Sequence, residues 1–152
     1  MEIFQLFRRE FGKNLISARL FLRQLPDCND HKTMTTTSVG NQGEYLACEY
    51  LKKLGYKILE RNYRIRGGEI DIVAMDKNFL VFIEVKTRYS SEYGLPVESI
   101  TPWKIKHLLK TARFYIQLID WGDQPYRLDF MGIDFTKDKD SPEIEIIKDI
   151  TS

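Results

Sequence analysis

The pattern of hydrophobic and polar residues from residue 39 onward predicts alternating helices and strands. Stretches with a helical repeat of apolar residues flank shorter stretches rich in β-branched residues. Gly55 is expected to end the first helix, while Thr101 and Pro102 suit the cap and first turn of the second. The predicted elements are a helix over 41–54, strands over 56–63, 70–75 and 80–86, a helix over 102–119, and strands over 126–135 and 143–147. The order α-β-β-β-α-β-β predicts an α/β fold.

Residues 1–37 follow a different pattern and are expected to lie outside the core domain, which we place at 38–152. Apolar residues recur there every three or four positions, with five basic residues among them up to Leu25. This pattern is typical of an amphipathic basic helix. Two interpretations stay open: an extension outside the fold, such as a start site placed too early, or a surface helix over 1–25 that makes a weak contact with a membrane or another protein.

Composition narrows the class of protein. The 152 residues carry a net charge of +1, which excludes binding of nucleic acid through bulk positive charge. The sequence contains no apolar run of the 18 or so residues that a membrane-spanning helix requires. Cys28 and Cys48 are the only cysteines and form no CxxC motif, so neither a disulfide framework nor a zinc site is indicated. We expect a cytoplasmic protein. No pattern predicts an oligomeric state.

Two acidic side chains are predicted to meet on the central hairpin. If a four-residue loop over 76–79 joins the two strands, Met75 lies opposite Leu80. Counting back from that pair places Asp71 opposite Glu84. Cross-strand neighbours have Cβ atoms about 4.5–5.5 Å apart. The sequence therefore predicts two carboxylates close together in an otherwise apolar sheet.

Like charges at this distance repel, and a divalent cation such as Mg²⁺ or Mn²⁺ would remove the repulsion. Lys86 shares the face of Glu84, where its ammonium group could polarise a metal-bound water or stabilise a phosphate. Glu44 on the first helix is a candidate third acidic member of the site. Simpler alternatives are a cross-strand ion pair between Glu69 and Lys86, and a favourable interaction of Glu44 with the dipole of the first helical turn.

These motifs together resemble the YraN family of bacterial proteins over about residues 39–135. That family is similar to the PD-(D/E)XK nuclease superfamily, near the archaeal Holliday-junction resolvases. The resemblance rests on Gly43-Glu44, Gly55-Tyr56, Asn62, Gly68-Glu69-Ile70-Asp71 and Phe82-Ile83-Glu84-Val85-Lys86-Thr87-Arg88. Ile70-Asp71 stands where the superfamily usually has Pro-Asp, and the carboxylate is retained.

The resemblance implies a restriction-endonuclease-like fold, a mixed β-sheet flanked by helices, with Mg²⁺ as the usual cofactor and Mn²⁺ as a substitute. It further implies that Asp71 and Glu84 bind the metal, that Lys86 is the catalytic lysine, and that Glu44 is the helix-borne acidic residue. Related folds have lost catalysis, so the resemblance implies this arrangement rather than an activity.

A DNA partner is expected to contact basic side chains around this site through its phosphates. On the second helix, Ile105, Leu109, Ala112 and Ile116 are predicted to form the apolar face. A solvated helix face is the alternative explanation for the basic residues there. The candidates are Arg64, Arg66, Arg88, Lys104, Lys106, Lys110 and Arg113.

The loop over 89–96 is expected at the mouth of the site. Tyr89 and Tyr93 could stack on a base or pack onto the second helix. The leading prediction is a metal-dependent nuclease that cleaves DNA phosphodiester bonds, with selectivity for branched or flapped structures. The alternatives are a non-catalytic nucleic-acid-binding or adaptor module on the same fold, and a partner-binding protein that docks through residues 1–25.

Overall fold

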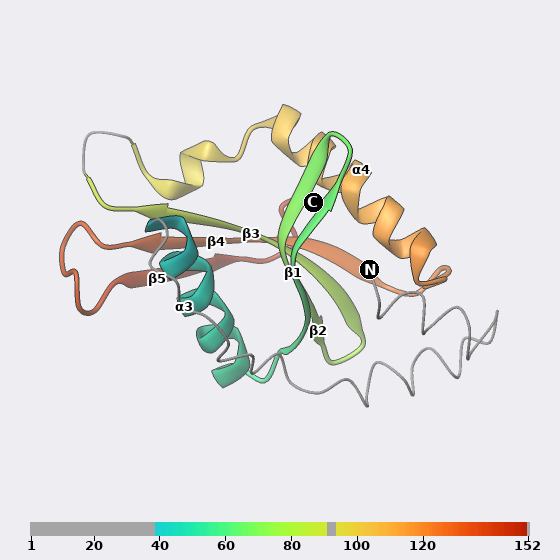
Figure 1. The fold of residues 1–152 in the computed structure, drawn as a ribbon, viewed down its shortest axis with the longest axis horizontal. Coiled ribbons are helices and arrows are strands. Elements are labelled where there is room, and N and C mark those ends of the chain that lie inside the picture. Colours follow the sequence, from blue (N-terminus) through green and yellow to red (C-terminus); the bar gives the residue numbers. More distant parts are fainter. Residues whose placement is uncertain (1–38, 91–93, 152) are drawn as a thin grey trace.

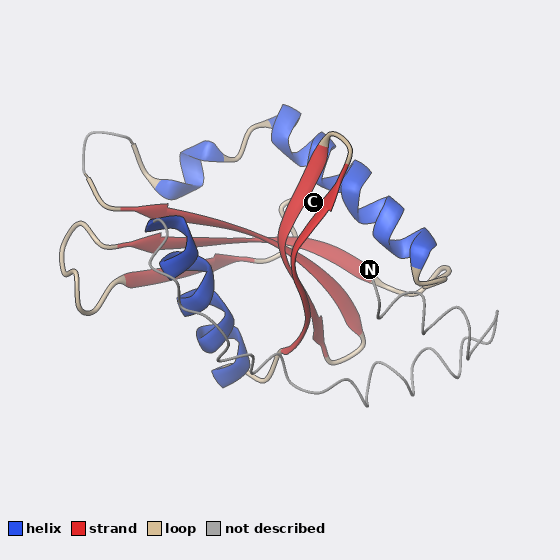
Figure 2. Cartoon of the chain, in the orientation of Figure 1, coloured by secondary structure: helices blue, strands red, loops and turns tan. Residues whose placement is uncertain are grey.

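One mixed β-sheet with a helix on each face forms the body of the protein in the computed structural model, which describes residues 39–90 and 94–151 (Figures 1 and 2). The predicted basic extension and part of the predicted loop at 89–96, including Tyr93, lie outside these residues. Among the described helices, none is long and apolar enough to cross a membrane.

The order of elements agrees with the prediction of a mixed α/β fold, with one short 3-10 helix, η1, added before the second long helix. The chain forms α3 (Val39–Lys53), β1 (Lys57–Ile65), β2 (Gly68–Asp76), β3 (Phe79–Arg88), η1 (Pro96–Ser99), α4 (Pro102–Leu118), β4 (Tyr126–Asp134) and β5 (Glu143–Ile147). The strands lie in the sheet in chain order. Only β3 and β4 are parallel, because α4 carries the chain back between them.

Local signals at the helix ends act as the sequence indicates. The hydroxyl of Thr101 accepts a hydrogen bond from the backbone N–H of Lys104 at 3.2 Å, and Pro102 occupies the first turn of α4. Gly55 follows α3 with a φ of +88°, a conformation that side chains disfavour. Local conformation therefore defines the C-terminal end of α3 and the N-terminal end of α4.

The β2–β3 hairpin has the predicted register but a shorter turn. Met75 lies opposite Leu80, as predicted, whereas the four-residue loop over 76–79 is wrong because Asp76 pairs with Phe79 and only two residues connect the strands. The carboxylate of Asp76 accepts a hydrogen bond from Arg127 at 2.7 Å. This contact stabilises Asp76 as a strand residue. The polar character of Asp76 is typical of a loop, which is why the sequence predicts one there.

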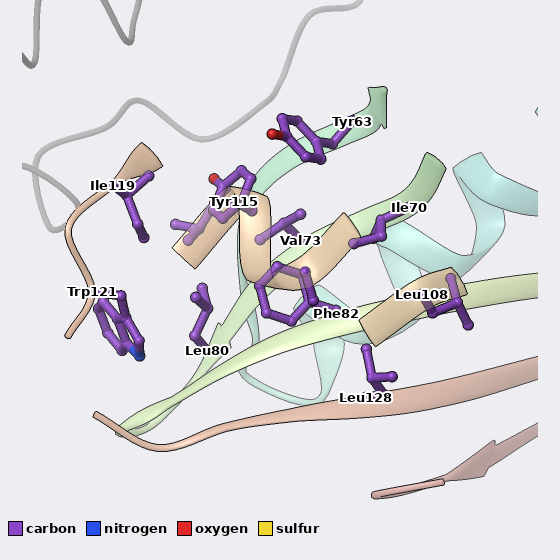
Figure 3. Packing of buried hydrophobic residues seen from close by; sticks show 12 residues of the cluster. Tyr63, Ile70, Val73, Leu80, Phe82, Leu108, Tyr115, Ile119, Trp121 and Leu128 are labelled. Atoms are coloured by element: carbon purple, nitrogen blue, oxygen red, sulfur yellow. The ribbon is translucent and has the colours of Figure 1, made fainter. Parts of the chain in front are cut away.

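Two hydrophobic clusters lie on opposite faces of the sheet. On one face, Phe82 and Leu128 pack against Leu108 and Tyr115 of α4 (Figure 3). On the other, side chains of α3 such as Leu51 pack against the alternate strand residues. Side chains alternate along β3, so Glu84 lies on the α4 face with Phe82, where it contacts Lys104 of α4.

The apolar face predicted for α4 is displaced around the helix. The buried residues are Leu108, Thr111, Ala112 and Tyr115. Of the predicted stripe, Ala112 is buried, while Leu109 and Ile116 pack at the edge of the cluster and Ile105 is half-buried. Tyr115 sets the orientation of α4 about its axis, because its ring packs edge-on against Tyr63 and Phe82 at centroid distances of 4.9 and 5.7 Å.

Candidate functional site

The site lies where β2 and β3 separate. Their pairing ends at Ile72 and Ile83. Beyond this point β2 continues beside β1 up to Gly68, while β3 continues beside β4 up to Arg88. The β1–β2 hairpin thus leaves the plane of the other strands (Figure 1). The first residues past the last pair are Asp71 and Glu84, so the predicted juxtaposition falls at a fork in the sheet.

The side chain of Asp71 connects the two strands where they separate. Its Oδ2 accepts a hydrogen bond from the backbone N–H of Val85 at 2.7 Å. If the pairing continued, Val85 would lie opposite Ile70, so the carboxylate replaces a backbone acceptor of the missing ladder.

The pKa of Asp71 is raised to about 7. Burial is the largest cause, followed by the negative charge of Glu84. The hydrogen bond from Val85 lowers the pKa, while the charges of Glu44 and Glu69 raise it further. No described lysine or arginine forms an ion pair with Asp71. The fork is therefore a strongly negative environment in which a bound cation would be stabilised.

The two carboxylate oxygens of Glu84 differ in their contacts. Oε1 forms an ion pair with Nζ of Lys104 at 2.8 Å, whereas Oε2 is buried without a hydrogen-bond partner in the described part of the chain. Burial lowers the pKa of Lys104, but the hydrogen bond and charge of Glu84, together with the charges of Asp71 and Glu69, raise it overall. A buried carboxylate oxygen without a donor is unfavourable and uncommon in proteins. Oε2 is therefore positioned to bind a ligand from solution.

The rest of the sheet shows how this protein pairs a buried acid. Asp129, which is buried on the α3 face, accepts two hydrogen bonds from Nε of Arg127, at 2.9 and 3.1 Å. The backbone N–H of Asp149 donates to the same carboxylate at 3.0 Å. Asp71 and Glu84 have one lysine between them. The fork thus contains more acidic than basic side chains.

The donor set fits a hard divalent cation. Asp71 and Oε2 of Glu84 are carboxylate oxygens, the ligands that Mg²⁺ and Mn²⁺ prefer. Among residues 39–90 and 94–151, no three His, Cys, Asp or Glu side chains form a group that could hold a metal ion. Mg²⁺ commonly uses one or two carboxylates and takes its other ligands from water and substrate phosphates. Two carboxylates are therefore a sufficient protein contribution.

Glu44 has side-chain partners of its own on β1. Its Oε2 accepts a hydrogen bond from the side-chain amide of Asn62 at 2.9 Å and lies 3.7 Å from Nη2 of Arg61. The interpretation based on the helix dipole is wrong, since α3 begins at Val39 and has no acidic residue in its first turn. Its charge raises the pKa of Asp71, so Glu44 contributes to the negative potential. Its role as a third acidic member of the site stays a prediction.

Lys86 is exposed and forms no ion pair with any described residue. The alternative of an ion pair with Glu69 is wrong, because the fork separates the two strands and Oε2 of Glu69 instead lies 3.3 Å from Nε of Arg64 across β1 and β2. Lys86 lines an open pocket of about 510 Å³ between the end of β3 and η1. Its ammonium group is therefore available to a ligand.

The pocket also contains Tyr89, whose ring stacks on Phe135 at a centroid distance of 4.5 Å. Tyr89 therefore packs on Phe135, and the alternative in which it packs on the second helix is wrong. Pro96 of η1 contacts Gly132 of β4 and forms another wall of the pocket.

The basic residues predicted to bind DNA fall into two groups. Arg64, Arg88 and Lys104 are engaged in ion pairs, with Glu69, Asp134 and Glu84 respectively. The exposed residues that form no ion pair with the described part of the chain are Arg66, Lys106, Lys110 and Arg113. Sequence reasoning missed the contact of Lys104 with Glu84, and periodicity alone carries no signal for it.

The fold and the fork define a mixed-sheet α/β protein with an acid-rich centre on its α4 face. The sequence model of the Uncharacterised protein family UPF0102 matches residues 43–133, and the chain belongs to that family. This agrees with the family that its motifs resemble. The matched segment contains Asp71, Glu84, Lys86 and Lys104.

Several relatives share most of their length with this chain. A UPF0102 protein of Dehalococcoides mccartyi is 48% identical over 109 residues, which cover 72% of this chain and 88% of the relative. One from Chlorobium limicola is 52% identical over 96 residues, 63% of this chain and 74% of the relative. One from Caldicellulosiruptor saccharolyticus is 41% identical over 115 residues, 76% and 98% of the two chains.

Replacing Asp71 with Asn tests the electrostatics of the fork. The folded protein holds its Asp71 proton up to about pH 7, whereas the ordinary pKa is 3.8, so folding favours the protonated form. Without metal, the free energy of unfolding of the wild type should therefore fall as pH rises from about 4 to about 7. Asp71→Asn should lack this component and, above pH 7, be more stable by ~1–3 kcal/mol.

Urea unfolding in EDTA at several pH values measures both quantities. Asn retains an oxygen that can accept the hydrogen bond from Val85, so the comparison isolates the charge. A variant with the same pH dependence as the wild type would contradict the assignment of the raised pKa to Asp71.

Proposed function

We propose that this protein is a metal-dependent nuclease that cleaves DNA phosphodiester bonds, with a restriction-endonuclease-like site of the PD-(D/E)XK type. The observation that carries the proposal is the buried Oε2 of Glu84, which has no hydrogen-bond partner among the described residues and lies beside Asp71 at the fork. The mixed sheet, the order of its elements and the position of Lys86 support it.

Asp71 and Glu84 would hold the metal, which would supply Lewis acidity toward the phosphate and lower the pKa of a water. Lys86, free of ion pairs with described residues, would position that water or stabilise the charge that develops on the phosphate. Glu44 and Glu69 would keep the site negative and so favour cation binding.

The cations of α4 that form no ion pair with described residues support DNA as the substrate. Lys106, Lys110 and Arg113 are exposed on its outward side, and Arg66 is exposed in the turn between β1 and β2. Such contacts with phosphates carry no sequence information. They favour a nuclease that selects DNA by its structure, such as a branch or a flap.

The second candidate is a non-catalytic nucleic-acid-binding or adaptor module on this fold. The observation that favours it is the ion pair of Lys104 with Glu84, because a lysine then partly neutralises the acidic site without metal. Binding would depend on the α4 cations alone, and the two candidates differ in whether a divalent ion binds.

Calorimetric titration with Mn²⁺ separates the candidates. The wild type should bind one ion, and Asp71→Asn should lose that binding while it unfolds cooperatively. With Mg²⁺ or Mn²⁺, the wild type should cut at least one DNA in a panel of duplex, single-stranded, flap and four-way substrates, and Asp71→Asn should cut none. Equal Mn²⁺ affinity of the two proteins would contradict the metal site. Binding of DNA without cleavage of any substrate would favour the adaptor module.

The variants Lys86→Ala and Lys110→Ala should separate chemistry from binding. Lys86→Ala should lower turnover by roughly 10²-fold or more, because its interaction is expected to be strongest in the transition state. Lys110→Ala should weaken DNA binding and lower the salt slope by about 1, with turnover at saturation retained. Single-turnover rates and affinities across a salt series measure the two effects. Unchanged turnover of Lys86→Ala would exclude its catalytic role.

Lys104→Met should tighten Mn²⁺ binding by roughly threefold or more, because the metal then no longer competes with an ammonium group for Glu84. Lys106→Met makes the same charge change two residues along α4, at an exposed position without an ion pair to described residues, and serves as the matched control. The same titration measures both. Equal gains in the two variants would mean that only the overall charge matters.

A further inference from the structure

Trp103 is the most exposed large hydrophobic side chain of the described residues, with 67% of its surface accessible. It lies in the first turn of α4, which Thr101 and Pro102 fix in place. Its ring contacts that of His107 at a centroid distance of 4.0 Å, and most of its surface stays free. A single exposed aromatic residue is common on protein surfaces, so any function of Trp103 has to be inferred from the residues around it.

A small hollow of about 140 Å³ lies beside Trp103. One wall is the Gly67–Gly68 turn, which presents backbone without side chains, and another is the first turns of α4. Lys104, which contacts Glu84, also lines the hollow, so the hollow adjoins the candidate metal site. The carboxylate of Glu69 lines it as well and disfavours a phosphate there. An uncharged flat ring suits this position better.

Cations continue from Trp103 along the same side of α4. Residues at this spacing lie on one helix face, and those on this side are Trp103, Lys106, Lys110, Arg113, Phe114 and Gln117. Phe114 is a second exposed aromatic side chain, and the described residues offer these three cations no acidic partner. The face is about 21 Å long at 1.5 Å per residue. A row of unpaired cations with exposed aromatic rings is complementary to a single-stranded nucleic acid, whose phosphates and bases it can contact together.

We infer that this face of α4 binds single-stranded DNA and that Trp103 stacks on an unpaired base next to the bond to be cut. The inference rests on the proposed nuclease function for the cut, whereas the binding stands by itself. It makes Trp103 a specificity-determining residue, since a base inside a duplex presents no free face to an indole ring. The substrate class is DNA with an unpaired nucleotide at the scissile position, such as a flap or a bulge.

The two tryptophans of the chain allow a direct test by fluorescence, because Trp103 is exposed and Trp121 is 2% accessible. Full-length wild type and Trp103→Phe are titrated in EDTA, which prevents cleavage, with an oligothymidylate and with a blunt duplex of equal length. The oligothymidylate should quench the wild-type emission strongly, and the duplex much less. Trp103→Phe, which reports only Trp121, should show little quenching with either DNA.

Affinity measurements complete the test. Trp103→Ala should bind the oligothymidylate about 5- to 150-fold more weakly, with nearly unchanged duplex affinity, and Trp103→Phe should retain most of the affinity. Leu118→Ala, another exposed apolar position on α4, is the matched control and should bind as the wild type does. Lys110→Ala should weaken binding of both DNAs, because it contacts phosphates.

The outcomes distinguish this inference from the proposed function. Wild-type affinity of Trp103→Ala, or emission of Trp103 that single strands leave unchanged, would overturn the inference even if Mn²⁺-dependent cleavage is observed. Loss of single-strand binding in Trp103→Ala without any cleavage by the wild type would support the inference and reject the nuclease. Failure of the wild type to bind either DNA, with Trp103 instead required for self-association in sedimentation experiments, would overturn the inference and make this face a protein interface, while the cleavage assay with Mn²⁺ decides the nuclease separately.

Discussion

The separation of β2 from β3 at Ile72 and Ile83 is the constraint on which the candidate site depends. Right-handed twist carries the β1–β2 hairpin away from the parallel β3–β4 pair. Past this point the backbone groups of β3 that face β2 have no hydrogen-bond partner in that strand's backbone, while those that face β4 remain paired. The carboxylate of Asp71 takes over one of them, the N–H of Val85, at 2.7 Å. In a continuous ladder, a backbone carbonyl would satisfy that group. The fork is thus what brings an acidic side chain into the middle of a sheet.

Helix α4 connects this fork to the rest of the molecule. Its inward side chains, Leu108 and Tyr115 among them, pack on the sheet and fix the rotation of the helix (Figure 3). That rotation directs Lys104 onto Glu84 and leaves Lys106 and Lys110 exposed. One packing interaction therefore sets both the charge inside the site and the charge around it. A change in the core residues of α4 would alter the site without touching it.

The same dependence explains how much the sequence could predict. β-branched stretches and turn residues specify the strands, and the register of Met75 with Leu80 follows from the hairpin. That register brings Asp71 near Glu84, although the strand pairing itself ends one residue earlier. Register counting does not show where pairing stops, so it wrongly paired Glu69 with Lys86. Periodicity gives the apolar stripe of α4 only coarsely, since Thr111 and Tyr115 are buried although they carry polar atoms. The contact between Lys104 and Glu84 depends on that rotation and was out of reach.

The two groups of buried charge in this sheet are satisfied to different degrees. At the Asp129 cluster, Arg127 and the backbone N–H of Asp149 donate hydrogen bonds to the acid, and the ring centroid of Phe79 lies 5.2 Å from the guanidinium. At the fork, Asp71 and Glu84 repel each other, and Oε2 of Glu84 has no donor in the described chain. A sheet that satisfies one buried acid fully does not need to leave another unsatisfied for structural reasons. Stability given up at one confined place is typical of sites that bind a ligand, and this contrast supports the proposal that a cation is the partner of Oε2.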